Sequence, residues 1–409
     1  MLTLPFDSAP SIDASTCLEE VLRRHLRGVL HNLLDEELNA FMEEMSGKRT
    51  ADGRQAIVRN GYHRERTVQT ALGPVPARVP RTRDRTGGND HFESAIITPY
   101  KRRSATFEEA ICYFYLKGLS TGDMLPALRE LFGSGVDNLS AASVSRLTRR
   151  WTGEYQQWSR RDLSAEDCVY IWVDGIHFKV RTGEHKLCTL VVMGATKDGR
   201  KQLLAVEGGY RESRESWAVL LRDLRQRGLR APKLFIGDGA LGFWAAAAEV
   251  YPESDNQRCW VHKTANILDR LPKNLQPKAK TMIHEMYLAE TKAAALAAHR
   301  RFQDVFADKY PRAVDCLNDS FDKLFAFYDY PAAHWRHIRT TNPIESTFAT
   351  VRKRTYSTRG QGSETTTLAL AFKLAQEAAK GWRRLNGHAL IMKLYDPNIK
   401  FEDGIEKAA

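Results

Sequence analysis

The segments VYIWVDG (residues 169–175), LFIGDGA (234–240) and TTNPIEST (340–347) contain the strand and helix patterns that decide the fold of this chain. In the first two, an apolar run of strand type is followed by Asp174 or Asp238 and then by Gly. In the third, Asn342 and Pro343 begin a helical pattern whose first turn holds Glu345. Two neighbouring strand ends and a nearby helix start bring three carboxylates together. We therefore expect Asp174, Asp238 and Glu345 to hold two Mg²⁺ or Mn²⁺ ions and to act in phosphoryl transfer.

Each carboxylate also has a purely structural interpretation. An Asp at a strand end commonly caps a turn or helix, and Asn342-x-x-Glu345 matches a capping box, in which the glutamate bonds its own helix end. The Cys-x-x-His pair Cys259 and His262 cannot close a tetrahedral zinc site, and no second pair with ligand spacing is present in the sequence. We expect this pair to support the active site by packing and hydrogen bonding.

The elements around these acids follow the order of a ribonuclease H-like α/β fold: three strands, then helix, strand, helix, strand and helix. The expected strands are 169–173, 187–193, 202–206, 234–236 and 257–261, and the expected helices between them are 213–226 and 240–250. The first gap between acids, from 174 to 238, is 64 residues, whereas the second, from 238 to 345, is 107. We predict that an all-α insertion over 263–335 fills the longer gap.

The N-terminal third is strongly basic. The whole chain carries a formal charge of +11, and residues 47–103 hold 13 Lys or Arg against 5 Asp or Glu. Such a segment is expected to bind a polyanion such as DNA, although a solvated basic surface is the alternative. Alternating apolar residues on both sides of Gly73-Pro74 predict a β-hairpin.

Helical patterns over 104–117, 121–132 and 140–151 resemble a helix-turn-helix, with Ser140 as the N-cap of the last helix. Many helix pairs of this shape bind no DNA. C-terminal to Glu345, a basic run on the same helix could contact the DNA backbone where it passes the metal ions. The alternative is a basic run that is only solvated. The predicted DNA-binding residues are Arg64, Arg66, Arg81, Arg83, Arg102, Arg103, Ser143, Arg146, Arg149, Arg150, Arg339, Arg352, Lys353 and Arg354.

A chain of 409 residues exceeds the usual size of one hydrophobic core. We predict an N-terminal helical region over 1–45, whose apolar face either packs internally or forms a dimer. A basic β-hairpin arm over 46–103 and a helix-turn-helix-like domain over 104–160 follow. The catalytic domain then occupies 167–262 and 336–409, interrupted by the helical insertion over 263–335.

The six cysteines lie far apart, and the sequence has neither a signal peptide nor an apolar segment of membrane-spanning length. They are Cys17, Cys112, Cys168, Cys188, Cys259 and Cys316. This distribution predicts reduced thiols and a soluble, cytoplasmic protein.

Long motifs resemble the IS256-type bacterial transposases, which are related to the eukaryotic Mutator-like elements. They are RNGYHRERTVQTALGPVPARVPRTRD (59–84), VYIWVDGIHFKVR (169–181), ESWAVLLRDLRQRGL (215–229), LFIGDGALGFW (234–244), QRCWVHKTANIL (257–268) and HWRHIRTTNPIESTFATVRKRT (334–355). The resemblance implies DDE chemistry on Asp174, Asp238 and Glu345, with the Cys-x-x-His pair as a family feature. It also implies a homodimer or higher assembly on double-stranded DNA, acting on terminal inverted repeats and target DNA through a circular intermediate.

Two other functions are compatible with the same patterns. A ribonuclease H-like, metal-dependent DNA nuclease or resolvase uses the same fold and acids for hydrolysis alone. A transposase-derived DNA-binding regulator has no catalysis. The large insertion and the basic N-terminal third favour a DNA assembly that both cuts and joins.

Overall fold

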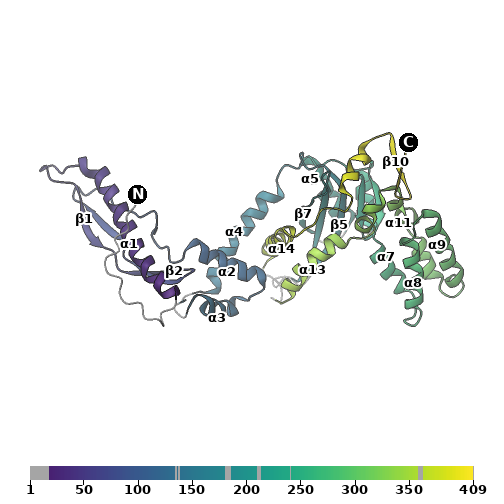
Figure 1. Ribbon diagram of the computed structural model, residues 1–409, viewed down its shortest axis with the longest axis horizontal. Helices are drawn as coiled ribbons and strands as arrows, with labels where there is room; N and C mark the ends of the chain where they lie inside the picture. Colours follow the sequence, from purple (N-terminus) through teal and green to yellow (C-terminus); the bar gives the residue numbers. More distant parts are fainter. Residues whose placement is uncertain are drawn as a thin grey trace. The chain divides into compact units, whose positions relative to one another are not determined.

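The computed structural model describes residues 18–133, 136, 139–179, 186–209, 213–239, 241–357 and 363–408 (Figure 1). Cys17 lies outside the described residues. The chain forms two compact units, residues 1–148 and residues 149–409. Each unit has its own core and is considered by itself.

The first unit combines one long helix, two antiparallel strand pairs and a helical bundle. Its elements are α1 (Leu18–Glu44), β1 (Ile57–Tyr62), β2 (Arg66–Thr70), β3 (Gly73–Ala77), β4 (Pro80–Asp84), α2 (Ala105–Lys117), α3 (Thr121–Phe132) and the start of α4 (Ala141–Ser159). The predicted hairpin is confirmed, because β2 and β3 pair antiparallel from Arg66 opposite Ala77 to Thr70 opposite Gly73. β1 pairs with β4.

The apolar face of α1 belongs to the core of this unit. Leu34 and Leu38 are 1% and 3% exposed and pack with Val68, Ala77 and Val79 of the hairpin region. The first alternative for the predicted N-terminal helical region, internal packing of its apolar face, therefore holds for these two leucines.

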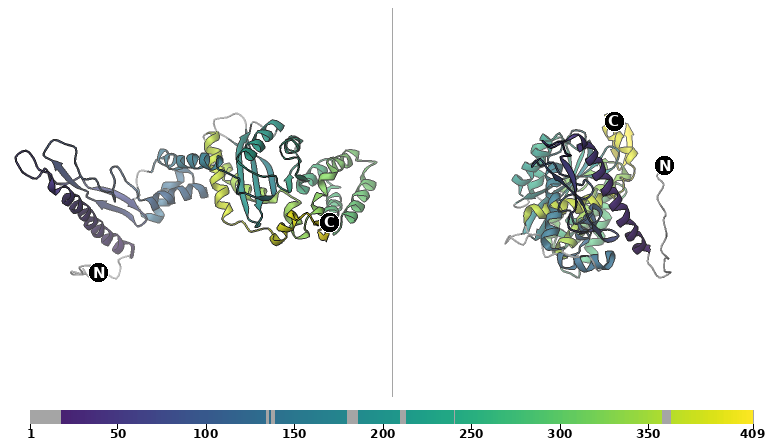
Figure 2. Two further views of the ribbon diagram at one scale, coloured as in Figure 1. Left: turned by 90° about the horizontal axis from the view of Figure 1, so that it is seen from above. Right: turned by 90° about the vertical axis from the view of Figure 1, so that its left-hand side faces the viewer.

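The second unit contains a five-stranded mixed sheet in the order β7-β6-β5-β8-β9. The strands are β5 (Cys168–Lys179), β6 (Lys186–Thr196), β7 (Lys201–Gly209), β8 (Leu234–Gly237) and β9 (Asp255–Arg258), and α5 (Arg214–Gln226) and α6 (Leu241–Val250) connect them. β5, β6 and β7 are antiparallel neighbours, whereas β8 and β9 run parallel to β5 (Figure 2). The predicted order of strands and helices is thus confirmed, as is a mixed α/β fold.

Several strands extend beyond their predicted ends, and two of the wrong boundaries concern the candidate site. β5 continues to Lys179, so Asp174 lies inside a strand opposite Val191 of β6 and does not follow the strand end. The predicted fifth strand is displaced: β9 ends at Arg258, and α7 (Trp260–Leu268) begins two residues later. Both errors arise because a Gly after an acid, or an apolar Trp-Val pair, does not by itself reveal whether hydrogen bonding to a neighbouring strand continues.

The two faces of the sheet have different partners. Ile171 and Val173 of β5 face the core formed with Trp217 of α5 and Phe243 of α6. Side chains alternate along a strand, so Tyr170, Trp172 and Asp174 face the opposite side. The Tyr170 hydroxyl contacts His334 Nδ1 at 2.7 Å, and Trp172 Nε1 donates to the carbonyl of His337 at 2.9 Å.

The rest of the second unit is mainly helical. After α7 come α8 (Gln276–Tyr287), α9 (Lys292–Phe306), α10 (Pro311–Asn318), α11 (Phe321–Leu324), α12 (Trp335–Ile338), α13 (Asn342–Ser357), α14 (Glu364–Ala379) and the hairpin β10 (Ile399–Glu402) and β11 (Ile405–Ala408). The buried Gln257 side chain of β9 donates to the carbonyls of Arg258 and Leu324 and accepts from Phe327 N–H, which joins the sheet to the helical region. None of the helices in the described ranges is long and apolar enough to cross a membrane.

Candidate active site

Asp174 and Asp238 lie side by side at the middle of the sheet. The parallel register of β5 and β8 matches Tyr170 with Leu234 and Trp172 with Ile236, so two residues further on Asp174 comes level with Asp238. Asp174 is only 6% exposed. Single ligand atoms of Asp174, Asp238 and His262 all lie within 4.8 Å of one another.

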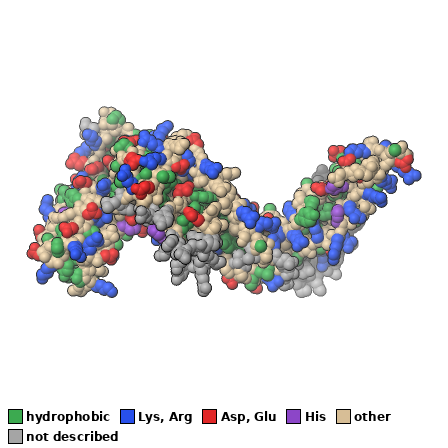
Figure 3. Space-filling view, turned by 180° about the vertical axis from the view of Figure 1, so that it is seen from behind, with side chains coloured by type: hydrophobic (Ala, Val, Ile, Leu, Met, Phe, Trp, Pro, Cys, Tyr) green, Lys and Arg blue, Asp and Glu red, His purple; other side chains and the backbone are tan. Residues whose placement is uncertain are grey.

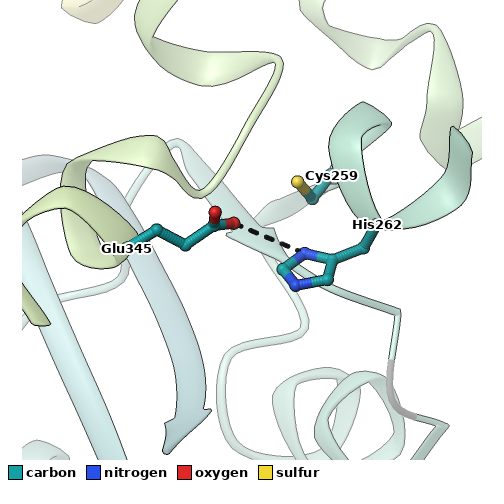
Figure 4. A group of neighbouring side chains, drawn as sticks. All are labelled: Cys259, His262 and Glu345. Atoms are coloured by element: carbon teal, nitrogen blue, oxygen red, sulfur yellow. Dashed lines mark ion pairs between the residues drawn. The ribbon is translucent and has the colours of Figure 1, made fainter. Parts of the chain in front are cut away.

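Glu345 reaches the same region from the first turn of α13. Its carboxylate accepts the hydroxyl of Thr341 at 2.7 Å and lies 3.7 Å from His262 Nδ1 (Figure 4). The carbonyl of Thr341 accepts the N–H groups of Ile344 and Glu345, so Thr341 is the N-cap and Asn342 is the first helical residue. The predicted cap at Asn342 is therefore wrong by one position.

The capping-box interpretation of Glu345 is not realised. In a capping box the glutamate accepts the N–H of the cap residue. The cap N–H of Thr341 instead donates to Cys259 Sγ at 3.3 Å, and the N–H of Asn342 donates to Thr340 Oγ1 at 3.4 Å. The Glu345 carboxylate thus points toward His262 and the other acids.

Cys259 and His262 link the sheet to Glu345. The N–H of Cys259 donates to the carbonyl of Gly237 at 2.7 Å, which fixes the start of α7 beside the end of β8. The buried Cys259 thiol accepts from Thr341, and Cys259, His262 and Glu345 form a second group with ligand atoms within 4.8 Å of one another. His262 belongs to both groups and is the side chain that connects Glu345 to the aspartates.

The electrostatics of these groups are strongly coupled. Burial raises the pKa of the Asp174 carboxyl to about 7; the charge of Asp238 and, more weakly, Glu345 adds to this, whereas His262 and Arg352 oppose it. The pKa of His262 is raised to about 9, first by its hydrogen bond with Cys259 and then by the neighbouring carboxylates, although burial acts in the opposite direction. These contacts favour the protonated form of His262.

This donor set fits a hard divalent cation. Asp174 on β5 and Asp238 directly after the adjacent β8 present carboxylate oxygens, and Glu345 adds another carboxylate beside them. Burial, and beside it the charge of Asp238, raises the pKa of the Asp174 carboxyl, and a bound cation would favour its ionised form. Mg²⁺ and Mn²⁺ prefer such oxygen ligands, whereas Cys259 is occupied as a hydrogen-bond acceptor for Thr341.

Sequence reasoning missed two residues of this region. Thr341, fully buried, contacts Glu345, Cys259 and His262 with one hydroxyl. Arg258 lies under the Asp238 loop: a Cβ at Gly239, whose φ is +99°, would overlap its guanidinium. The position directly before Asn342-Pro343 was a signal for Thr341 as a cap, but the partner of its hydroxyl depends on the tertiary fold.

The predicted DNA-binding residues separate into exposed and internally engaged side chains. Arg339 donates to the carbonyls of Tyr287 and Trp335, and Arg354 is 5% exposed, which argues against DNA contacts for these two. Arg66 donates to the carbonyls of residues 97 and 98, and Arg103 is half-buried. Arg352 lies 3.9 Å from Asp174. Surface-exposed or half-exposed are Arg64, Arg81, Arg83, Arg102, Ser143, Arg146, Arg149, Arg150, Arg352 and Lys353.

Comparison with known proteins gives matches over nearly the whole chain. Residues 4–384 match the family model described as transposase, Mutator family. The chain is 53% identical over 283 residues to the transposase for insertion sequence element IS6120 of Mycolicibacterium smegmatis, covering 69% of this chain and 87% of that protein. It is 30% identical over 381 residues to the ISRM5 transposase of Rhizobium meliloti, covering 91% and 93%. The transposase for IS256 in transposon Tn4001 of Staphylococcus aureus is 28% identical over 357 residues, covering 86% and 88%.

Proposed function

Because the chain belongs to the Mutator family of transposases, we propose that it cuts DNA at the ends of its own insertion sequence and joins the freed 3′-hydroxyls to other DNA. Asp174, Asp238 and Glu345 are the catalytic carboxylates. The observation that carries this assignment is their convergence on His262 from β5, the loop after β8 and the start of α13. These elements are separated by long stretches of chain, and no local structural need brings their acids together.

The arrangement of the second unit supports a ribonuclease H-like catalytic domain. Three antiparallel strands are followed by two strands parallel to the first, with Asp174 inside β5 and Asp238 directly after the adjacent β8. The helices α8 to α11 lie between β9 and the helix that carries Glu345, which is where the all-α insertion over 263–335 was predicted. Regular elements hold ligands more accurately than loops do.

Two Mg²⁺ or Mn²⁺ ions held by these carboxylates would stabilise the attacking and leaving oxygens during cleavage and strand transfer. The residues of the chain supply the surroundings. Burial of Asp174 limits water access, and the Thr341 hydroxyl orients the Glu345 carboxylate. His262 and Arg352 bring positive charge to the place where a phosphodiester would lie, and Cys259 supports the site through Thr341.

The expected substrate is double-stranded DNA, at terminal inverted repeats and at a target. Residues 46–103 and 104–160 are proposed as DNA-binding regions because they hold most of the predicted DNA contacts that are exposed or half-exposed. A homodimer or higher assembly acts at the two element ends, and the excised element passes through a circular intermediate. These features follow from the resemblance to IS256-type transposases.

A strand-transfer assay tests the proposal. Purified full-length protein is incubated with Mg²⁺, a supercoiled plasmid and a labelled duplex taken from the DNA that flanks the gene. Asp174→Asn and Glu345→Gln should each lose at least about 100-fold in both cleavage and joining while retaining DNA binding. Glu253→Gln, at an exposed position, is the matched control.

The possible results separate the candidate functions. Cleavage at the wild-type rate by Asp174→Asn would refute the assignment of the acids. Hydrolysis without joining by the wild type would indicate a nuclease or resolvase. Specific binding with no cleavage in either Mg²⁺ or Mn²⁺ would indicate a DNA-binding regulator.

A further inference from the structure

The first unit contains a basic cavity that is separate from the candidate active site. Its volume is about 690 Å³, and it lies between β2, the loop over residues 98–104 and the N-terminal ends of α2 and α4. Lys101, Arg102, Arg103 and Arg146 line it, with Glu108 as the acidic residue of its lining. Lys and Arg side chains are also prominent on the surface of this unit in the view of Figure 3. Four cationic side chains around one cavity favour an anionic ligand.

The backbone holds this cavity in a defined shape. Gln69 N–H of β2 donates to the carbonyl of Arg102, and Ser104 N–H donates to the carbonyl of Gln69, both at 2.8 Å. Ser104 also caps α2 by accepting the N–H of Phe107. The backbone of the basic loop is thereby fixed between a strand and the N-terminus of a helix, so this backbone does not have to be ordered when a ligand binds.

The positive charge of the cavity is only partly compensated. Arg102 and Arg146 are exposed, and neither guanidinium has a hydrogen-bond or ion-pair partner within the described part of the chain. Burial lowers the pKa of Arg103; Glu108 opposes this effect, and the charges of Arg146 and Arg102 add to it. Like charges crowded in this way are stabilised by a bound anion.

An aromatic side chain stands at the edge of the cavity. Tyr100 is 92% exposed and has a φ of +64°, in the left-handed region that bulky residues rarely adopt. Exposed aromatic rings next to basic residues pack on nucleotides, on the sugar in a duplex and on the base where the strand is unpaired. Strained backbone at an exposed position is consistent with a binding role, because such strain concentrates at functional sites.

We infer that this cavity binds a phosphodiester of the DNA backbone, with Arg102 and Arg146 contacting the phosphate oxygens and Tyr100 packing on the neighbouring nucleotide. The inference rests on the proposed function, because it takes DNA as the partner. It goes beyond the predicted contacts in two ways. It places residues of the loop over 98–104 and of α4 in one site, and it assigns nucleotide packing to Tyr100 and an opposing charge to Glu108.

The test measures binding of the full-length protein to a fluorescein-labelled 30-base-pair duplex from the DNA flanking the gene. EDTA is present so that cleavage cannot contribute. Arg102→Gln and Arg146→Gln should each weaken binding about fivefold and reduce the slope of log affinity against log salt by about 1, since each removes one phosphate contact. Arg24→Gln, an equal loss of charge on exposed α1, should leave affinity within about twofold and the slope unchanged.

Variants of Tyr100 and Glu108 should change the affinity and its salt dependence in other ways. Tyr100→Ala should weaken binding about tenfold with an unchanged salt slope, because stacking involves no net charge, and Tyr100→Phe should bind like the wild type. Glu108→Gln should bind about threefold more tightly, since it removes the negative charge that faces the phosphate. A gain of affinity cannot result from misfolding.

The outcomes distinguish this inference from the proposed function. Unchanged affinity and salt slope in both arginine variants, or weaker binding by Glu108→Gln, would overturn the phosphate assignment while leaving the catalytic proposal intact. Absence of any duplex binding by the wild type would overturn both.

Discussion

Replacing Thr341 by Val should slow DNA cleavage without unfolding the protein. The Thr341 hydroxyl donates to Glu345 Oε1 at 2.7 Å, and the residue is fully buried. A hydrogen bond to a charged acceptor is worth about 1.5–3 kcal/mol. The lower end of this range applies because the Glu345 side chain is 28% exposed, so water can replace part of the interaction. Valine preserves the shape of the side chain and the backbone bond from Thr341 N–H to Cys259 Sγ.

The expected loss of cleavage rate exceeds the loss of stability, because the hydroxyl orients the proposed catalytic carboxylate of Glu345. We expect single-turnover cleavage of a labelled element-end duplex in Mg²⁺ to fall about 10- to 100-fold. The free energy of unfolding should fall by only about 1.5 kcal/mol, and duplex binding in EDTA should not change. Thr341→Ser keeps the hydroxyl and should restore most of the rate.

Thr340→Val is the matched control. Thr340 is also buried, at 8% exposed, but its hydroxyl only accepts the N–H of Asn342 over 3.4 Å. Its cleavage rate should stay within about twofold of the wild type. Wild-type cleavage by Thr341→Val, or an equal loss in Thr340→Val, would refute the positioning role of Thr341.

Three other variants test burial, backbone and packing. Burial raises the pKa of Asp174 from 3.8 to about 7 in the folded state, so between these pH values the folded protein holds a proton that the unfolded chain has lost. The free energy of unfolding therefore falls as pH rises from about 4 to 7, by at most about 4 kcal/mol for this group. The melting temperature of Asp174→Asn, measured relative to the wild type, should therefore be higher at pH 8 than at pH 5. The same difference in melting temperature at both pH values would contradict the burial argument. Gly239→Ala should lower the unfolding free energy by about 2 kcal/mol, from positive φ and overlap with Arg258, whereas Gly53→Ala, at positive φ in open space, should lose only about 1 kcal/mol. Gln257→Leu leaves the N–H of residue 327 and two carbonyls without this partner and should reduce the unfolding free energy by about 3 kcal/mol in urea titrations.

The order of elements in the second unit followed from local patterns. Short apolar runs identified the strands, and the predicted helix over 213–226 corresponds to α5, capped by Ser213. The hairpin around Gly73 was also predicted correctly, because alternation and turn residues act over a few neighbouring positions. Boundaries were less certain: Asp174 lies inside β5 because β6 continues to pair with it.

The candidate site was only partly predictable. Three acids of suitable type at strand and helix positions indicated the proposed catalytic groups, and the Cys-x-x-His pair was expected beside them, but the sequence did not indicate that His262 would lie between Glu345 and the aspartates. Thr341 is 82 residues from Cys259, and Tyr170 is 164 residues from His334. Such contacts depend on how helices pack on the sheet, which no local periodicity encodes.

The sequence by itself therefore determined which residues form the strands and helices, which carboxylates are available, and where the basic charge is concentrated. Periodicity, capping residues and composition act locally and can be recognised without a fold. Only the tertiary structure decided that Glu345 turns toward His262 instead of capping its helix, that Arg339 and Arg354 are engaged internally, and that Arg102 and Arg146 share one cavity. The physical reason is that side-chain direction and burial are set by the packing of distant segments.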